Sequence, residues 1–433
     1  MITSAKNQTL RLIITIVLLN SGVSFAQSQT ASTLFDRYSS GVVQVRTIDL
    51  ASGDKTSIGS GFSVDGGRYV ATNFHVVSLL IHAPETYRLE LVDDEGETIE
   101  ATVAAIDVIH DLALLSPARE VTRSLRLRTT TPSQGDRIFS LGNPQDLGMT
   151  IIEGNYNGLV KKSRYQKILF SGSLNSGMSG GPAIDSRGRV LGINVSKGGE
   201  QISFLVPAEQ LQFVIDKARR ANLGSDNSSE FQRPDFVEQI RTALYNDQST
   251  FYSKLLEDDW SLETFGGLML PQKISNTLKC WGHTVEDDDL LYESFHQHCQ
   301  SNDAIYIDDN FYTGQFEYDF EWLESNELNT FQFYNAVERR FSHKSQHSGS
   351  DEEDVSEYQC NTDIVSIADS RWKVSSCFRA YQSYDDLYDA LLLMAALDSN
   401  NTSAVLKASA TGISQNSATA LFAKLMGAIA WKP

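Results

Sequence analysis

The sequence predicts an all-β N-terminal region of two small barrels, followed by an acidic C-terminal region of mixed α-helix and β-strand. Between residues 33 and 206, short β-prone runs alternate with Gly, Asn, Asp and Pro, as in barrels and sandwiches. Beyond residue 234 the chain becomes rich in Asp, Glu and aromatic residues. A length of 433 residues also exceeds one ordinary domain.

Individual elements follow from the local pattern. Residues 41–47, 98–103 and 190–195 are β-prone runs. Pro207 is suited to the first position of a helix that ends near Gly224. We therefore expect one domain over 33–222, a linker at 223–233 and a second domain over 234–433.

The second domain is expected to contain helices around 234–258, 384–398 and 416–430. Weak strands and polar loops, such as 344–354, separate them. The final segment, 418–431, is amphipathic and carries one lysine before its end, Lys424, so docking on a core is favoured over lying on a membrane.

The N-terminus is typical of a secretory signal peptide spanning residues 1–26. Lys6 and Arg11 precede the apolar run 12–19, and Ser24-Phe25-Ala26 supplies small residues for cleavage after Ala26. A membrane anchor is the alternative, but the apolar run is short for one. We expect a soluble, exported protein, periplasmic or secreted, with no stable membrane insertion after cleavage.

Four cysteines lie in the second half of the chain. An even number in an exported protein favours disulfides. The simplest of the three possible pairings joins sequence neighbours, Cys280 with Cys299 and Cys360 with Cys377. Zinc is the alternative, but no CxxC or HxxxH spacing supports it.

Charge is divided unevenly. Residues 1–222 carry 22 Lys and Arg against 21 Asp and Glu, whereas the rest of the chain carries 14 against 34. Such an acidic surface disfavours nucleic acids and anionic membranes as partners. The acidic runs 286–289 and 351–354 lack the alternation of a calcium loop, so solvated loops are favoured. We expect no metal and no cofactor.

Three segments together predict nucleophilic catalysis. His75 follows the strand-like run 69–72, Asp111 opens the apolar run 112–115, and Ser179 lies between glycines. A serine hydroxyl needs a base to take its proton, and the base needs an acceptor that fixes its tautomer. The chain order His, Asp, Ser differs from that of α/β-hydrolases and subtilisins.

The glycines around Ser179 also predict an oxyanion hole. They allow a tight turn that directs the N–H groups of Gly177 and Ser179 toward a developing negative charge. His110 is the competing histidine. It lacks the glycine-rich strand approach of His75, and we interpret it as structural.

These motifs resemble the trypsin-like serine proteases of the bacterial DegP/HtrA branch. The matching segments are Gly59-Ser60-Gly61-Phe62-Ser63-Val64, 69–77, 111–115, Leu141-Gly142-Asn143-Pro144, 175–182, 190–195 and 203–207. The resemblance covers residues 33–222. It implies two perpendicular six-stranded β-barrels with the active site between them.

The resemblance also implies roles for individual residues. His75 is expected to be the general base, Asp111 its orienting partner and Ser179 the nucleophile. The strand edge at Asn194, Val195 and Ser196 is expected to pair with the substrate backbone.

The pocket for the substrate side chain before the cut bond is expected between residues 171–174, including Ser173, and residues 193–197. Neither stretch contains an acidic residue, which argues against a preference for Arg or Lys. Small or medium apolar side chains are expected instead.

Two features depart from the family pattern. Met178 replaces the usual Asn or Asp before the nucleophile, so activation by a new N-terminal amine is not expected. No glycine-bearing carboxylate-binding loop of a PDZ domain is evident after residue 234. The C-terminal domain is left with three alternatives: binding substrates, assembling the protein or shielding the active site.

We therefore predict an exported serine endopeptidase that cleaves protein or peptide substrates through an acyl-enzyme, with a place in protein quality control. The alternative is a non-catalytic binding or regulatory protein on a protease-like fold.

Overall fold

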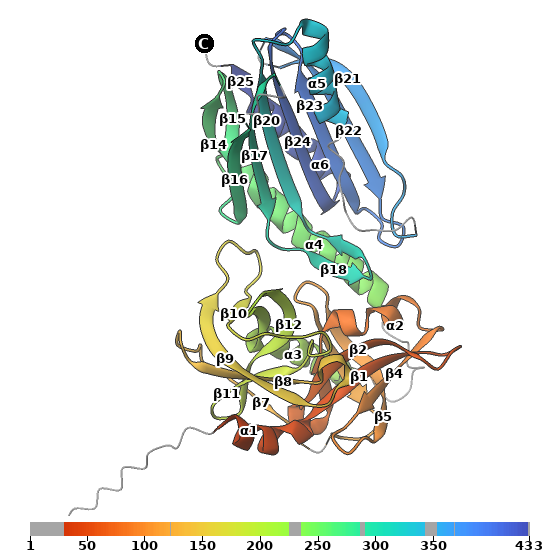
Figure 1. Cartoon of the computed structure of the whole chain (residues 1–433). Coiled ribbons are helices and arrows are strands. Elements are labelled where there is room, and N and C mark those ends of the chain that lie inside the picture. Colours follow the sequence, from red (N-terminus) through yellow and green to blue (C-terminus); the bar gives the residue numbers. More distant parts are fainter. Residues whose placement is uncertain are drawn as a thin grey trace, which may run out of the picture.

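The computed structural model describes residues 30–121, 123–224, 235–285, 291–342, 353–367 and 369–431 (Figure 1). The predicted signal peptide, the acidic run 286–289 and nearly all of the predicted linker lie outside these residues. Among the described residues, no helix is long and apolar enough to cross a membrane.

The first barrel is closed and six-stranded. Its strands are β1 (Val42–Asp49), β2 (Lys55–Val64), β3 (Tyr69–Thr72), β4 (Tyr87–Val92), β5 (Thr98–Asp107) and β6 (Leu112–Pro117), in the order β1-β2-β3-β6-β5-β4. Helix α1 (Ala31–Tyr38) precedes it, and α2 (Ser78–His82) follows the short turn η3 (Phe74–Val76). The barrel confirms the predicted strands at 41–47 and 98–103.

The second barrel also has six antiparallel strands. They are β8 (Arg137–Gly142), β9 (Thr150–Leu159), β10 (Ile168–Phe170), β11 (Pro182–Asp185), β12 (Arg189–Gly199) and β13 (Ile202–Pro207), closed by pairing of β11 with β12. A short strand, β7 (Arg126–Leu127), adds to β12 in parallel. The predicted pair of six-stranded barrels is thus confirmed.

Helix α3 (Ala208–Gly224) follows the second barrel directly and confirms the predicted helix, although Pro207 is the last residue of β13 and not the first of the helix. Its buried side chains, Leu211, Val214, Ile215 and Ala218, join a cluster that contains Phe62 of the first barrel and Ile193 of the second. The helix therefore packs against both barrels.

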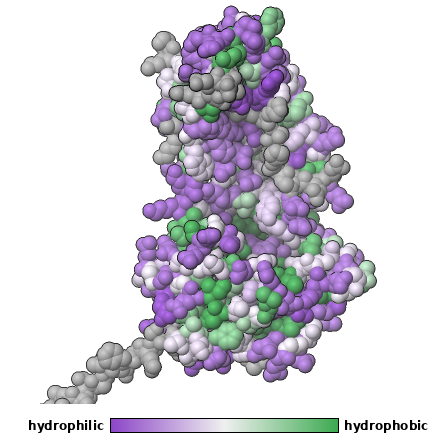
Figure 2. All heavy atoms as spheres, viewed as in Figure 1, coloured by the Kyte–Doolittle hydropathy of each residue, from purple (hydrophilic) through white to green (hydrophobic). Residues whose placement is uncertain are grey.

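The C-terminal region is built on a seven-stranded antiparallel sheet (Figure 1). Its strands, in spatial order, are β16 (Leu278–Val285), β17 (Glu293–Ser301), β20 (Phe316–Glu324), β24 (Thr402–Ile413), β23 (Tyr388–Ala396), β22 (Ser370–Ala380) and β21 (Gln359–Ile367). Helices α4 (Phe236–Glu257) and α6 (Gln415–Gly427) share one core with the sheet, and α5 (Thr330–Ser342) packs in another. The region is mixed α and β, as predicted, and the face seen in Figure 2 is largely hydrophilic there.

Two smaller elements complete the region. Strands β14 (Ser261–Phe265), β15 (Leu268–Lys273) and β25 (Ala430–Trp431) form a three-stranded sheet. Strands β18 (Ile305–Asp308) and β19 (Phe311–Thr313) form a hairpin.

One predicted helix is wrong. Residues 384–398 contain strand β23, whereas α4 and α6 confirm the other two predicted helices. The run of Leu, Met and Ala in β23 has high helix propensity. Nevertheless, β23 lies between β22 and β24, and every side chain from Asp389 to Ala396 is buried, so tertiary context overrides propensity.

Both predicted disulfides are confirmed. Cys280 pairs with Cys299 across β16 and β17, and Cys360 pairs with Cys377 across β21 and β22. Strands β16 and β21 are the two edges of the seven-stranded sheet. Each disulfide therefore ties an edge strand to its neighbour.

A continuous apolar core joins the first barrel to the C-terminal region. One cluster contains side chains of the first barrel, of the residues around His75, of α4, of the β18–β19 hairpin and of the β22–β23 connection. Its members include Val45, Phe74, Val76, Ile81, Leu115, Ile240, Leu244, Ile305, Phe311 and Tyr384. The two regions accordingly pack as one body through this cluster.

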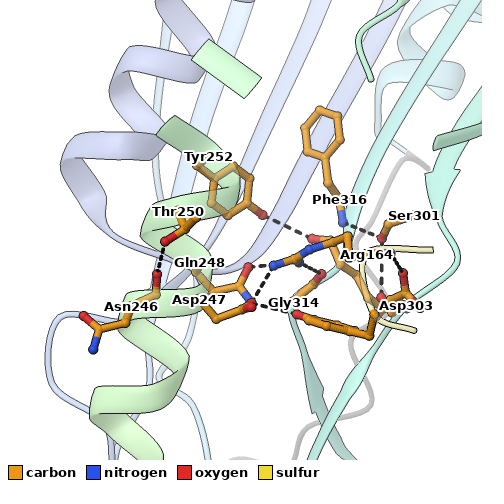
Figure 3. A network of polar contacts seen from close by, with 12 residues as sticks. Arg164, Asn246, Asp247, Gln248, Thr250, Tyr252, Ser301, Asp303, Gly314 and Phe316 are labelled. Atoms are coloured by element: carbon orange, nitrogen blue, oxygen red, sulfur yellow. Dashed lines mark hydrogen bonds and ion pairs between the residues drawn. The ribbon is translucent and has the colours of Figure 1, made fainter. Parts of the chain in front are cut away.

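A polar network fixes a second junction (Figure 3). The guanidinium of Arg164, from the β9–β10 loop, donates to the Gly314 carbonyl at 2.9 Å, pairs with Asp247 and lies 3.9 Å from the centre of the Phe251 ring. In return, the buried carboxylate of Asp303 accepts hydrogen bonds from that loop, at 2.8 Å from the hydroxyl of Ser163 and 2.6 Å from the N–H of Arg164.

Candidate active site

His75 and Asp111 form a tight pair. Strand β3 ends at Thr72, and the turn η3 then presents His75, while Asp111 lies directly before β6. The Nδ1 of His75 lies 2.7 Å from Oδ2 of Asp111, and the backbone N–H of His75 donates to Oδ1 at 2.9 Å. Both carboxylate oxygens therefore hold one imidazole in place.

The carboxylate also sets the proton affinity of the imidazole. Burial by itself lowers the pKa of His75, but the charge of Asp111 and its hydrogen bond outweigh burial, so the pKa lies above its ordinary value. The side chain of His75 remains 27% exposed. It can therefore meet a substrate from the solvent side.

The backbone of Ser179 lies close to the segment that carries His75. Its carbonyl accepts a hydrogen bond from the N–H of Ser60 at 2.7 Å. A Cβ built on Gly59 would lie 2.6 Å from Val76, the residue after His75, and 3.2 Å from the Ser179 carbonyl oxygen. One glycine thus allows the serine backbone to approach the histidine segment.

The Ser179 hydroxyl has a hydrogen-bond acceptor in the second barrel. Its Oγ donates to the carbonyl of Val195 at 3.0 Å. Among the described residues, no hydrogen bond joins this hydroxyl to the ring of His75.

The turn before Ser179 has the form of an oxyanion hole. Gly177 has a φ of 89°, and the turn is closed by hydrogen bonds from Met178 N–H to Asn175 and from Gly181 N–H to Met178. Among the described residues, the N–H groups of Gly177 and Ser179 have no hydrogen-bond acceptor. Both remain available to an anion.

A buried hydroxyl supports this turn. The Oγ of Ser60 donates to the Gly177 carbonyl at 2.7 Å and accepts from the N–H of Asn143 at 2.9 Å. The hydroxyl of Thr72 in turn donates to the Ser60 carbonyl at 2.8 Å. We did not predict these supporting roles, although Ser60, Thr72 and Asn143 all lie in the motifs that the sequence offered.

Met178 and Asn194 are internal. Met178 is fully buried in the core of the second barrel. Its uncharged side chain cannot form an ion pair with an N-terminal amine. The side chain of Asn194 is also buried, and its Nδ2 donates to the carbonyls of Leu141 and Met178 at 3.1 Å each. Its side chain therefore holds the nucleophile turn from behind.

The remaining predicted substrate residues are less buried than Asn194. Val195 is half-buried, Ser196 is exposed, and Ser173 is half-buried in the segment before the turn. Strand β12 pairs with β13 from Gly192 to Gly199, with a register shift at Val195, whereas its pairing with β11 stops at Ile193. The other edge of β12 is therefore open beside Ser179.

His110 forms a separate local pair. Its Nδ1 lies 2.8 Å from Oδ2 of Asp107, and its ring packs edge-to-face on Tyr165. Among the described residues, no group of three or more His, Cys, Asp or Glu is arranged to hold a metal ion.

One contributor to the site was missed by sequence reasoning. Tyr306, in the hairpin of the C-terminal region, places its ring edge-to-face against His75, with centroids 5.7 Å apart. More than 200 residues separate the two in the chain. The local sequence predicts a hairpin at most, and no local signal tells where it docks.

Comparison with known proteins agrees with this geometry. The family model described as "Trypsin-like peptidase domain" matches residues 59–193, which include all three triad positions. The chain contains a trypsin-like peptidase domain. The match begins in β2 and ends in β12, and the C-terminal region lies outside it.

The curated relatives of the peptidase domain are distant homologues. Serine endoprotease DegS of Salmonella typhimurium is 30% identical over 179 residues, which cover 38% of this chain and 49% of that protein. A probable periplasmic serine endoprotease, DegP-like, of Brucella suis is 32% identical over 171 residues, which cover 37% and 32%. The chain thus spans about a third to a half of the length of the curated relatives it matches.

A solved structure is also similar to this chain. The serine endoprotease from Yersinia pestis is 26% identical, with a TM-score of 0.38, and the alignment covers 44% of this chain and 67% of that one.

Proposed function

We propose that the protein is a serine endopeptidase that cleaves protein or peptide substrates through an acyl-enzyme. The observation that carries this proposal is the constellation of His75, Asp111 and Ser179 beside two available N–H groups. Each part has the chemistry required by acyl transfer.

The first step would be attack on a peptide carbonyl. The Ser179 oxygen adds to the carbonyl carbon while its proton passes to Nε2 of His75. The carbonyl π-electrons move to the oxygen, which the N–H groups of Gly177 and Ser179 would stabilise. Asp111 stabilises the imidazolium that forms.

The second step would release the amine. The tetrahedral intermediate collapses, the C–N bond breaks, and His75 gives its proton to the departing nitrogen. Water then attacks the acyl-enzyme with His75 again as base, and Ser179 is restored.

The exported setting is part of the proposal. The residues 1–26 have signal-peptide character, and both disulfides suit an oxidising compartment. The similarity to a DegP-like protein described as periplasmic agrees with this. We propose a periplasmic or secreted enzyme with a place in protein quality control.

Labelling with a fluorophosphonate tests the nucleophile. The parent protein should react, and Ser179→Ala should show no labelling. Ser176→Ala is a matched control, because its exposed side chain is three residues away in the same loop.

Labelling of Ser179→Ala equal to that of the parent would remove Ser179 from the mechanism. A parent that does not react at all would favour the alternative, a binding or regulatory protein on a protease fold.

A further inference from the structure

Two tyrosines of the β18–β19 hairpin lie at the catalytic histidine. Tyr306 packs edge-to-face on His75 at 5.7 Å and on Phe74 at 6.4 Å, and its hydroxyl lies 3.3 Å from the hydroxyl of Ser78. Tyr312 packs edge-to-face on Tyr306 at 5.4 Å. A row of aromatic rings therefore extends from the imidazole outward.

The hairpin holds this pair on one face. Tyr306 and Tyr312 are directly opposite in the strand register, so their side chains point to the same side. The alternate residues Ile305, Ile307 and Phe311 are buried in the core shared with the first barrel. The aromatic pair is thus presented from a fixed support.

A second set of contacts anchors the hairpin from behind. The hydroxyl of Thr313 lies 2.7 Å from that of Tyr381, which also packs edge-to-face on Phe311 at 4.9 Å. The Tyr381 hydroxyl further donates to the buried carboxylate of Asp389 at 2.7 Å.

The outer tyrosine is open to a ligand. Tyr312 is 42% exposed. An aromatic side chain contributes most to folding or binding energy when its ring is buried. Tyr306 is half-buried, with one side taken by Phe74 and His75.

The direction of a bound substrate points to the occupant. A peptide that adds to the open edge of β12 at Val195 runs as a strand past Ser179. Side chains of a strand alternate in direction. If the cleaved residue faces residues 171–174 of the second barrel, the residue before it faces the first barrel, where His75 lies.

We propose that Tyr306 and Tyr312 form the wall of a subsite that selects an apolar side chain at the substrate residue preceding the cleaved residue. The C-terminal region would then complete the active-site cleft. This inference rests on the proposed endopeptidase function.

The local charge adds a second criterion. Asp308 is the last residue of β18 and Asp309 follows it in the turn of the hairpin. Burial, together with the charges of Asp309 and Asp111, raises the pKa of Tyr312, so the surroundings of the outer ring are negatively charged. An acidic side chain in the subsite would be repelled, while an apolar one would pack on the rings.

Peptidyl phosphonates test the subsite because they react with an active serine nucleophile and carry peptide side chains. We would use three that keep valine at the cleaved position and place leucine, glycine or aspartate before it. In the parent, the leucine compound should react at least about tenfold faster than the glycine compound, and the aspartate compound slowest.

Tyr312→Ala should reduce the preference for leucine over glycine by about tenfold. Tyr312→Phe should restore the preference, because the ring is kept. Tyr306→Ala should lower it as well, provided that its thermal unfolding midpoint stays near that of the parent. Phe331→Ala removes an exposed aromatic from α5 and should change nothing.

Labelling by a fluorophosphonate without a peptide separates the two proposals. Ser179-dependent labelling with an unchanged leucine preference in Tyr312→Ala would overturn the subsite alone. No labelling of the parent would overturn the endopeptidase and the subsite together.

Discussion

Asp111 adopts a left-handed backbone conformation, with a φ of 54°. Such a conformation is uncommon outside glycine, and Asp and Asn adopt it most readily. Its carbonyl accepts a hydrogen bond from Nδ2 of Asn73 at 2.8 Å, while its carboxylate holds the backbone and ring of His75. The neighbourhood of the triad thus supports an unfavourable backbone geometry that aims the carboxylate.

The raised pKa of His75 predicts how reactivity depends on pH. His75 must be neutral to accept a proton, so the labelling rate of Ser179 should rise with pH through a midpoint above about 6.5.

In Asp111→Asn no carboxylate charge offsets the effect of burial on the pKa of His75, so the midpoint should fall. The labelling rate should also drop, on the order of 10⁴-fold, because an asparagine does not hold the His75 ring in the tautomer that accepts the serine proton. Rates of fluorophosphonate labelling from pH 5 to 9 check both, and an unshifted midpoint in Asp111→Asn would contradict the assignment.

Gly177 predicts a second residue-scale effect. Its φ is positive, and a Cβ would lie 2.6 Å from the Asn143 carbonyl oxygen. Gly177→Ala should therefore displace the oxyanion turn and reduce the labelling rate at least a hundredfold. Gly148→Ala is the matched control, because Gly148 also has a positive φ of 105° but open space around it. Equal losses in both variants would show that backbone strain alone is responsible.

At the level of elements, the two edge strands of the C-terminal sheet bury little. Residues 280–284 of β16 are half-buried or exposed, as are all the residues of β21. Hydrophobic burial therefore contributes little to holding either edge. The cross-strand disulfides supply the attachment that packing does not.

Removing one disulfide should have a measurable cost. The loops that they close have sequence separations of 19 and 17 residues, for which restriction of the unfolded chain contributes about 3 kcal/mol each. The double variant Cys360→Ala/Cys377→Ala should lower the free energy of unfolding by about this amount in denaturant titrations. Dithiothreitol should lower it further in that variant, through Cys280 and Cys299. An unchanged midpoint in both experiments would contradict a stabilising role.

The elements also show what the sequence could predict. The barrels were recoverable because β-prone runs and their turns are local signals, and the pairing of His75 with Asp111 was recoverable from two local motifs beside β3 and β6. Strand β23 was not, because its Leu-rich sequence suits a helix and only its neighbours β22 and β24 decide the outcome. Asn194 shows the same limit, since its burial behind the nucleophile turn depends on Leu141, far away in the chain.

At the scale of the whole molecule, the catalytic region and the C-terminal region share a core. The cluster around Phe74 and Val76 continues into Ile240, Leu244 and Ile305. Because such contacts join segments remote in sequence, no local pattern predicted them. The shared core also means that the position of the hairpin at His75 depends on packing rather than on the linker.

Interface packing predicts cooperative unfolding. The buried carboxylate of Asp303 accepts from Ser163 and Arg164 and pairs with Lys167 at 3.1 Å, so Asp303→Ala should lower the free energy of unfolding by about 2–3 kcal/mol. The parent should unfold in one calorimetric transition. Asp94→Ala, at an exposed position, should change stability by less than about 0.5 kcal/mol. Two well-separated transitions in the parent would contradict a shared core.

The disulfide pattern has a consequence for biosynthesis. Each cysteine meets its partner within the same β-hairpin, so the closing loop is short and the correct thiol is the one encountered first. A newly synthesised chain therefore needs an oxidant but little reshuffling by an isomerase. The order of synthesis alone, with Cys299 emerging long before Cys360, directs each sulfur toward its proper mate.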